Sequence, residues 1–137
     1  MKTEVRYFTK SGNTKLVADA IATEVGKIAL PVSESLTEYV DILFLGSSMY
    51  KFTIDKAVTD FIKENAQNIG TLVNFSTSAS GKSTLKKIKK VANLYGVNVL
   101  SEEFYCFGHF WIFHKNRPDQ QDLNNAKIFA IEVMRNV

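Results

Sequence analysis

The sequence predicts an α/β fold, a five-stranded parallel sheet with helices on both faces, in one domain spanning residues 1–137. Short apolar runs alternate with segments whose apolar residues recur every three or four positions, as in strands followed by amphipathic helices. The connections are short, which favours parallel pairing through right-handed crossovers. A chain of 137 residues is long enough for one domain with one core.

The first unit is a strand, a tight polar turn and a helix. Residues 5–8 form the strand pattern, and residues 9–14 form the turn. Gly26 ends the helix, because a left-handed C-terminal cap favours a residue without a Cβ atom. The predicted core face of this helix carries Leu16, Val17, Ala20, Ile21 and Val25.

The middle of the chain continues the alternation. Residues 27–32 are a weak edge strand, since Pro31 cannot donate to a sheet ladder, and residues 33–40 are a loop or short helix. The apolar run 41–46 is typical of a strand covered on both faces. A helix is expected from about Asp55, and its core face carries Ala57, Val58, Phe61 and Ile62.

The last part repeats this pattern. A strand at 71–75 is followed by a small-residue loop at 76–81 and a helix at about 82–95. That helix has an apolar side formed by Leu85, Ile88, Val91, Ala92 and Tyr95. A fifth strand begins at 97–100 and continues through 103–107, with an interruption left open. A long loop, 108–118, precedes a last helix with Leu123, Ala126, Ala130, Val133 and Met134 at core spacing.

The turn at residues 9–14 has the features of a phosphate site. Its backbone N–H groups lie at the positive end of a helix dipole. Gly12 lets the backbone approach a ligand, and Asn13 tolerates a tight turn. Side-chain hydroxyl donors come from Thr9, Ser11 and Thr14. The alternative is an ordinary strand-to-helix turn with a threonine N-cap.

Three polar loops, 9–14, 47–53 and 76–81, follow three strands of the predicted sheet. Carboxyl ends of parallel strands meet at one edge, which is where such sheets bind ligands. The sequence therefore predicts one elongated ligand that carries a phosphate.

The first loop resembles the phosphate loop of flavodoxins, Ser/Thr-x-Thr-Gly-Asn-Thr, with Ser11 in place of the middle threonine and Lys10 at the free position. The resemblance to short-chain flavodoxins covers essentially the whole chain and implies strand order 2-1-3-4-5. The tail is also similar to a subgroup of flavodoxin-like proteins, through Cys106, Gly108, Phe110, Pro118 and Asp122.

The resemblance implies that the cofactor is FMN. Its phosphate would be held by Thr9, Lys10, Ser11, Gly12, Asn13 and Thr14. One side of the flavin ring would face Ser47, Ser48, Met49 and Tyr50. The other edge would pass Thr77, Ser78, Ala79 and Gly81, with backbone donors. Tyr50 is the best stacking candidate, and packing on the protein is its equal alternative.

Two features depart from the usual flavodoxin pattern near the ring. The third loop has no aromatic residue, so His109, Phe110 or Trp111 could supply the second face, although core packing or a partner surface is the favoured role. Residues 49–52 contain no glycine. A left-handed conformation costs other residues about 1–2 kcal/mol, so we expect weaker stabilisation of the half-reduced flavin than is usual in the family.

Charge is the third departure, because flavodoxins are usually acidic and this chain has a net charge of +3. That excess is too weak to indicate a nucleic-acid partner. One helix face carries Lys82, Lys86, Lys89 and Lys90. A solvated face is the commoner role of such a stripe, and its functional role would be to steer an acidic redox partner.

Other classes are disfavoured. Gly81-Lys82-Ser83-Thr84 resembles the end of a P-loop, but Ser76 stands where that motif needs a glycine. Cys106, His109 and His114 do not form a closed zinc set, so no metal site is assigned and packing of Cys106 is favoured. The lone cysteine, the absence of a signal-peptide pattern and the absence of a long apolar run predict a cytoplasmic protein without membrane insertion.

Two functions are expected from the resemblance. The favoured one is an FMN-binding electron carrier between redox partner proteins, because no acid–base pair can be placed beside the ring and no catalytic residue is assigned. The alternative is a small FMN-dependent oxidoreductase acting on a quinone, a porphyrinogen or NAD(P)H. A weaker third option is a domain that has lost FMN and binds only protein. The oligomeric state is left open.

Overall fold

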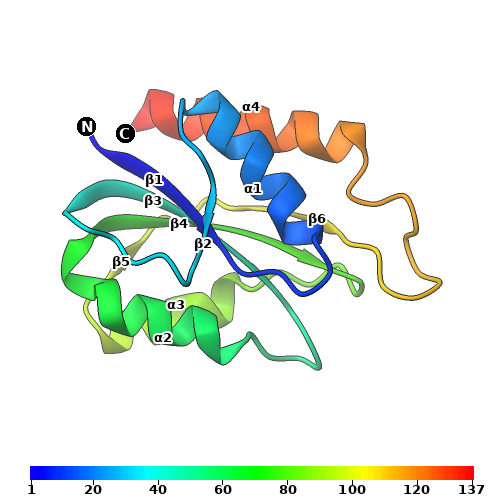
Figure 1. The fold of residues 1–137 in the computed structure, drawn as a ribbon, viewed down its shortest axis with the longest axis horizontal. Coiled ribbons are helices and arrows are strands. Elements are labelled where there is room, and N and C mark those ends of the chain that lie inside the picture. Colours follow the sequence, from blue (N-terminus) through cyan, green and yellow to red (C-terminus); the bar gives the residue numbers. More distant parts are fainter.

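The computed structural model describes all residues, 1–137. Strands and helices alternate along the chain as predicted (Figure 1). The elements are β1 (Thr3–Tyr7), α1 (Asn13–Glu24), β2 (Leu30–Pro31), β3 (Val40–Ser48), α2 (Lys56–Asn65), a 3-10 turn (Ala66–Asn68), β4 (Ile69–Ser78), α3 (Leu85–Leu94), β5 (Asn98–Val99), β6 (Phe104–Phe107) and α4 (Gln120–Asn136).

The strands form one parallel sheet in the order β2-β1-β3-β4-β5, which confirms the predicted order 2-1-3-4-5. β5 pairs with β4 at Thr71 and Leu72, and β6 pairs with β4 farther along, from Phe75 to Ser78. β5 and β6 are therefore two parts of the predicted fifth strand, separated by an interruption. β2 is a two-residue edge strand that ends at Pro31, as expected from its missing N–H.

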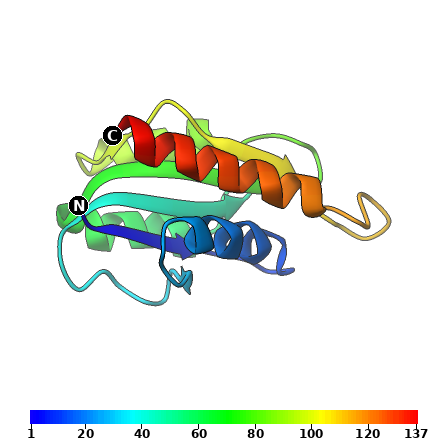
Figure 2. The same cartoon turned by 90° about the horizontal axis from the view of Figure 1, so that it is seen from above.

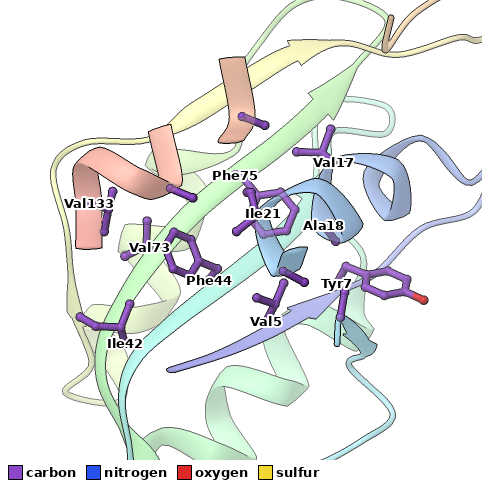
Figure 3. Packing of buried hydrophobic residues seen from close by; sticks show 14 of the residues in the cluster. Val5, Tyr7, Val17, Ala18, Ile21, Ile42, Phe44, Val73, Phe75 and Val133 are labelled. Carbon is purple, nitrogen blue, oxygen red and sulfur yellow. The ribbon is translucent and has the colours of Figure 1, made fainter. Parts of the chain in front are cut away.

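Helices cover both faces of the sheet: α1 and α4 lie on one face, and α2 and α3 on the other (Figures 1 and 2). Side chains of β3 alternate between the two faces, so Phe44 packs under α1 and α4 whereas Leu43 and Leu45 pack under α2 and α3. Figure 3 shows Phe44 and Phe75 beneath the apolar side of α1. Burying a side chain of this size contributes about 2–3 kcal/mol.

The helix ends are fixed by local chemistry, which was predicted for Gly26. Gly26 has φ +70°, and the N–H of Lys27 donates to the carbonyl of Ala22 at 2.9 Å, which closes α1 as a left-handed cap requires. Asp55 caps α2 by accepting from the N–H of Ala57 at 2.9 Å. None of the helices has the length and apolar composition needed to cross a membrane.

Three boundaries differ from the predictions. β3 and β4 continue to Ser48 and Ser78, so the second and third loops are shorter than expected. α3 begins at Leu85 rather than near Lys82, because Ser83 accepts from the N–H of Leu85 and so fixes its first turn.

Two residues assigned to core faces are exposed: Leu16 lies at the margin of the buried side of α1, and Tyr95 lies past the end of α3.

Candidate functional site

The carboxyl edge of the sheet holds a cavity of about 750 Å³. The loops after β1, β3 and β4 line it, together with the loop at residues 108–118. Nine of the residues singled out from the sequence lie on its wall: Lys10, Ser11, Asn13, Ser48, Met49, Tyr50, Thr77, Ser78 and Ala79. His109 and Phe110 line it from the long loop.

The N-terminus of α1 presents backbone N–H groups that have no acceptor within the protein. They belong to Ser11, Asn13, Thr14 and Lys15. α1 has no side-chain cap and no acidic residue in its first turn, whereas aspartates cap α2 and α4. α3 likewise has no side-chain cap and no acidic residue in its first turn, but its first residues do not line the cavity. The positive end of α1 is not neutralised, and it can receive an anion at the cavity.

Thr9 and Gly12 shape the first loop rather than lining the cavity. The Thr9 hydroxyl accepts from the N–H of Gly12 at 2.8 Å, which folds the turn back on itself. Gly12 has φ +93°, and no atom lies within 4 Å of where its Cβ would be. The turn thus requires glycine for its backbone angle and not for space.

The Thr14 hydroxyl points inward, to a triangle of three hydroxyl groups. It lies 2.6 Å from the Ser48 hydroxyl and 2.9 Å from that of Thr77, and Ser48 and Thr77 are 3.1 Å apart. All three residues are buried. The triangle joins the start of α1 to the ends of β3 and β4, because each hydroxyl can donate once and accept twice. The side chain of Thr14 is therefore engaged within the protein, and its backbone N–H is the group left unpaired.

Tyr50 lies between the first and second loops. Its hydroxyl accepts from the N–H of Lys10 at 3.4 Å, and the Lys10 ammonium lies 4.8 Å from the centre of its ring. The same ammonium is 3.9 Å from Asp55. These contacts place a cation and an aromatic ring together at the cavity wall.

The second loop is a tight two-residue turn. The backbones of Tyr50 and Thr53 exchange hydrogen bonds of 2.8 and 2.9 Å. Lys51 has φ +49° and Phe52 has φ +65°, so both central residues are left-handed without being glycine. The sequence predicts an energetic cost for such angles in a loop without glycine, and it does not exclude them. The structure adopts them at both positions, at a cost of about 1–2 kcal/mol per residue.

Ser47 and Gly81, expected at the cavity, do not line it. Ser47 is fully buried and donates to the Thr84 hydroxyl at 2.9 Å, on the face covered by α3. Successive strand residues point to opposite faces, so only Ser48 of the pair faces the cavity. The backbone of Gly81, at φ +77°, packs against Phe107, whose ring would lie 2.8 Å from an added Cβ.

The 108–118 loop is joined to the first loop by Asn13, whose side chain donates to the carbonyl of His109 at 2.8 Å. The ring of His109 contacts the carbonyl of Trp111 at 2.7 Å. Trp111 itself is 72% exposed and does not line the cavity. Of the three candidates for a second aromatic face, His109 and Phe110 are therefore at the cavity and Trp111 is not.

Some lining residues were missed by the sequence analysis. Phe52, Thr53 and Ser80 line the cavity from within the predicted loops, although no contact with the ligand was assigned to them. Ile54, Asp55 and Lys56 line it from beyond the second loop. A helix was expected from about Asp55, but the place of Asp55 beside the ligand loops was not. A helix that starts directly after a ligand loop brings its first residues to the cavity. Because Asp55 and Lys56 follow the second loop in the sequence, their position at the cavity could have been predicted.

At the end of the long loop, Arg117 forms a two-pronged ion pair with Asp122 in the first turn of α4, with N–O distances of 2.5 and 2.7 Å. Hydrogen bonding from Arg117 lowers the pKa of Asp122 below its ordinary value. Burial raises the pKa of the nearby Cys106 thiol to about 12. Cys106 is therefore neutral at physiological pH and packs as a small apolar residue, as favoured from the sequence.

The chain resembles several proteins over nearly its full length. No protein-family model matches the sequence. An uncharacterized protein of Methanocaldococcus jannaschii is 26% identical, over 90% of this chain and 91% of its own length.

Solved flavodoxin structures match the fold closely. A flavodoxin from the domain Archaea superposes with a TM-score of 0.80 at 19% identity, covering 99% of this chain and 98% of its own. Oxidised flavodoxin 1 from Bacillus cereus gives 0.75 at 18% identity, covering 100% and 99%. Rubredoxin oxygen:oxidoreductase from Desulfovibrio gigas superposes with a TM-score of 0.70 at 19% sequence identity, and the match covers 98% of this chain and 35% of that one. The protein therefore has the flavodoxin-like fold that its sequence predicts.

Proposed function

We propose that the protein binds FMN in the 750 Å³ cavity and carries electrons between redox proteins. One observation carries the proposal. α1 is the only helix whose N-terminus opens beside this cavity without a carboxylate cap, and four N–H groups there, one from Ser11 and three from the first turn of α1, lack an acceptor. A phosphate ester would satisfy donors arranged in this way.

The residues present fit FMN in size and chemistry. The volume lies within the roughly 300–1,000 Å³ typical of small-ligand sites. The phosphate would take the N–H groups of Ser11, Asn13 and Thr14, with the Lys10 ammonium nearby. Met49, Tyr50 and Phe110 offer apolar surface to a flavin ring.

The third loop can recognise the polar edge of the ring. The N–H groups of Ala79, Ser80 and Gly81 have no acceptor within the protein. Gly81 does not line the cavity, so its expected contribution is limited to its backbone donor. When bound, FMN supplies one- and two-electron transfer, and the surrounding groups hold it and exclude water.

An electron carrier is favoured because the cavity lacks a free acid–base pair. Asp55 caps α2 and faces Lys10, and a ring nitrogen of His109 is held by the Trp111 carbonyl. A cytoplasmic location is part of the proposal, since the lone cysteine is a free, buried thiol.

Titration with FMN and with riboflavin tests the proposal. Binding to the protein should quench the fluorescence of both flavins. FMN should bind at least about 100-fold more tightly than riboflavin, because only FMN carries the phosphate. Equal affinities, or no binding after refolding with FMN, would refute the site. Steady oxidation of NADPH with a quinone acceptor would favour the oxidoreductase, whereas reduction only through a partner protein supports the carrier.

A further inference from the structure

Large apolar side chains are exposed at the cavity wall and in the turn that begins there with Phe110. Phe52, Phe110, Trp111, Ile112 and Phe113 are each more than half exposed. The last four form one tight turn, whose ends exchange backbone hydrogen bonds of 3.0 and 2.8 Å. Four consecutive exposed apolar residues are unusual in a protein that meets only water, and aromatic residues are enriched at interfaces.

Uncompensated positive charge lies next to this apolar surface. α3 contains no acidic residue, and no lysine between residues 82 and 90 has a carboxylate within 4 Å. Lys15 on α1 and Lys56 on α2 differ, because each pairs with an aspartate one turn later, at 2.8 and 2.7 Å. The charge of α3 is therefore available to an external group.

The two features are continuous. The Lys82 ammonium lies 5.2 Å from the centre of the Phe52 ring, and Phe52 lines the cavity. Lys86 and Lys90 follow Lys82 at intervals of four residues and are exposed. Basic groups thus run from the cavity mouth along α3. Asp55 is the lone acidic residue on the cavity wall, and it faces Lys10.

From this arrangement we propose that an acidic redox protein docks over the cavity mouth, which rests on the proposed electron-carrier function. The docking surface consists of Phe52, the turn 110–113, and the lysines at 51, 82, 86 and 90. Its partner carries negative charge around an apolar depression that receives the turn. The charges accelerate encounter, and the buried aromatic residues lengthen the lifetime of the complex.

An anionic bilayer shares the charge chemistry, but the geometry favours a protein. The 108–118 loop projects beyond the end of the sheet, whereas α3 covers one of its faces (Figures 1 and 2). A flat membrane has to meet both in one plane, whereas a protein surface can follow the corner between them. A bilayer over the mouth would also separate redox partners from the bound cofactor, whereas a docked redox protein is itself the partner.

Stopped-flow reduction of the FMN-loaded protein tests this surface. The probe is a pre-reduced acidic [2Fe–2S] ferredoxin, and photoreduced deazariboflavin is the uncharged comparison. The second-order rate with ferredoxin should fall about tenfold or more between 20 and 500 mM salt, and the rate with deazariboflavin should not change.

Two double variants with the same change in charge, one on α3 and one on α4, show which helix is responsible for the salt-dependent rate. Lys86→Glu with Lys90→Glu on α3 should slow reduction by ferredoxin about tenfold at low salt. Lys127→Glu with Arg135→Glu on α4, on the opposite face, should change it less than twofold. Trp111→Asn, which keeps a residue that tolerates the positive φ, should raise the ferredoxin concentration at half-saturation about tenfold. The milder Lys86→Gln with Lys90→Gln serves if the reversal impairs folding.

The outcomes separate the two proposals. A colourless protein refutes FMN binding and leaves the wild-type rates unmeasurable. A yellow protein whose ferredoxin rate ignores salt, or is slowed equally by the α3 and α4 variants, refutes the docking surface alone. Co-sedimentation with phosphatidylglycerol vesicles that is lost in Trp111→Asn would assign the surface to lipid and would likewise overturn the protein partner.

Discussion

The side chain of Asn13 donates a 2.8 Å hydrogen bond to the carbonyl of His109, across 96 positions of sequence. Asn13 belongs to the first loop and His109 to the 108–118 loop, so the predicted phosphate site is tied to the aromatic loop at the cavity mouth. Asn13 also packs closely against the residue before His109, since a Cβ atom added to Gly108 would lie 2.9 Å from the amide nitrogen of Asn13. Asn13 thus does more than tolerate a tight turn.

Asn13→Ala should release the 108–118 loop while leaving the sheet intact. The lost bond is partly exposed, so the free energy of unfolding should fall by no more than about 1 kcal/mol. Amide hydrogen exchange of residues 108–117 should rise, and FMN should bind several-fold more weakly. Asn98→Ala is the matched control, because Asn98 makes a similar exposed bond to Thr71 at 3.2 Å away from the cavity. Unchanged exchange in the loop would contradict the tether.

Neighbouring serines of β3 provide a second test. Ser47→Ala and Ser48→Ala each remove one buried hydroxyl, and each should lower the free energy of unfolding by about 1–2 kcal/mol. Only Ser48 faces the cavity through the hydroxyl triangle, so only Ser48→Ala should weaken FMN binding. Fluorescence titration combined with urea unfolding separates the two effects. Equal losses of FMN affinity in both variants would show that the face of the strand does not matter.

The same two serines show how far the sequence leads. The apolar run before them predicted a buried strand ending in a ligand loop, which locates the site but not which serine faces it. That choice depends on where the strand ends, and β3 continues through Ser48 because it stays paired with β4 as far as Thr77. Caps such as Asp55 and Gly26 were predictable, since their causes lie within one turn of helix.

Contacts between residues far apart in the chain could not be predicted from the sequence. Nothing near Thr14 indicates that its hydroxyl meets Thr77, and nothing near Asn13 indicates His109. These contacts depend on how loops far apart in the chain come together at one edge of the sheet. Motifs therefore located the loops, and packing decided the orientation of individual side chains.

Lys51→Gly should stabilise the folded protein. Lys51 has φ +49°, an angle that glycine adopts without a Cβ clash, so the variant should gain up to about 1 kcal/mol in urea unfolding. Lys51→Ala removes the same charge but keeps the strain and should not gain stability. If the alanine variant gains as much, charge repulsion rather than the backbone angle is the cause.

The redox consequence of this turn is still a prediction. A second loop without glycine should stabilise half-reduced FMN weakly, and Lys51→Gly should increase the fraction of that species in a redox titration. A dominant, long-lived neutral half-reduced flavin in the wild type would contradict the expectation.

The Arg117–Asp122 ion pair should make stability depend on acid pH. Asp122 has a folded-state pKa below its ordinary value of about 3.9, so its contribution is present above that value and is lost as the pH falls through the folded-state pKa. Asp122→Asn should cost about 1–3 kcal/mol at pH 7, because it weakens a charge-assisted bond to Arg117 and the cap at Asp119. The difference from wild type should shrink below about pH 4, where the wild-type carboxylate is increasingly protonated.

Asp119→Asn is the control for that measurement. An asparagine keeps the oxygen that accepts from the N–H of Asp122, so the cap is retained and the ion pair of Arg117 with Asp122 is left in place. Its effect on unfolding should be small and nearly constant with pH, because the more exposed Asp119 makes only a 3.6 Å contact with Arg117. A constant deficit of Asp122→Asn from pH 7 to pH 3 would show that the side chain contributes through helix capping alone and that its charge does not stabilise the loop.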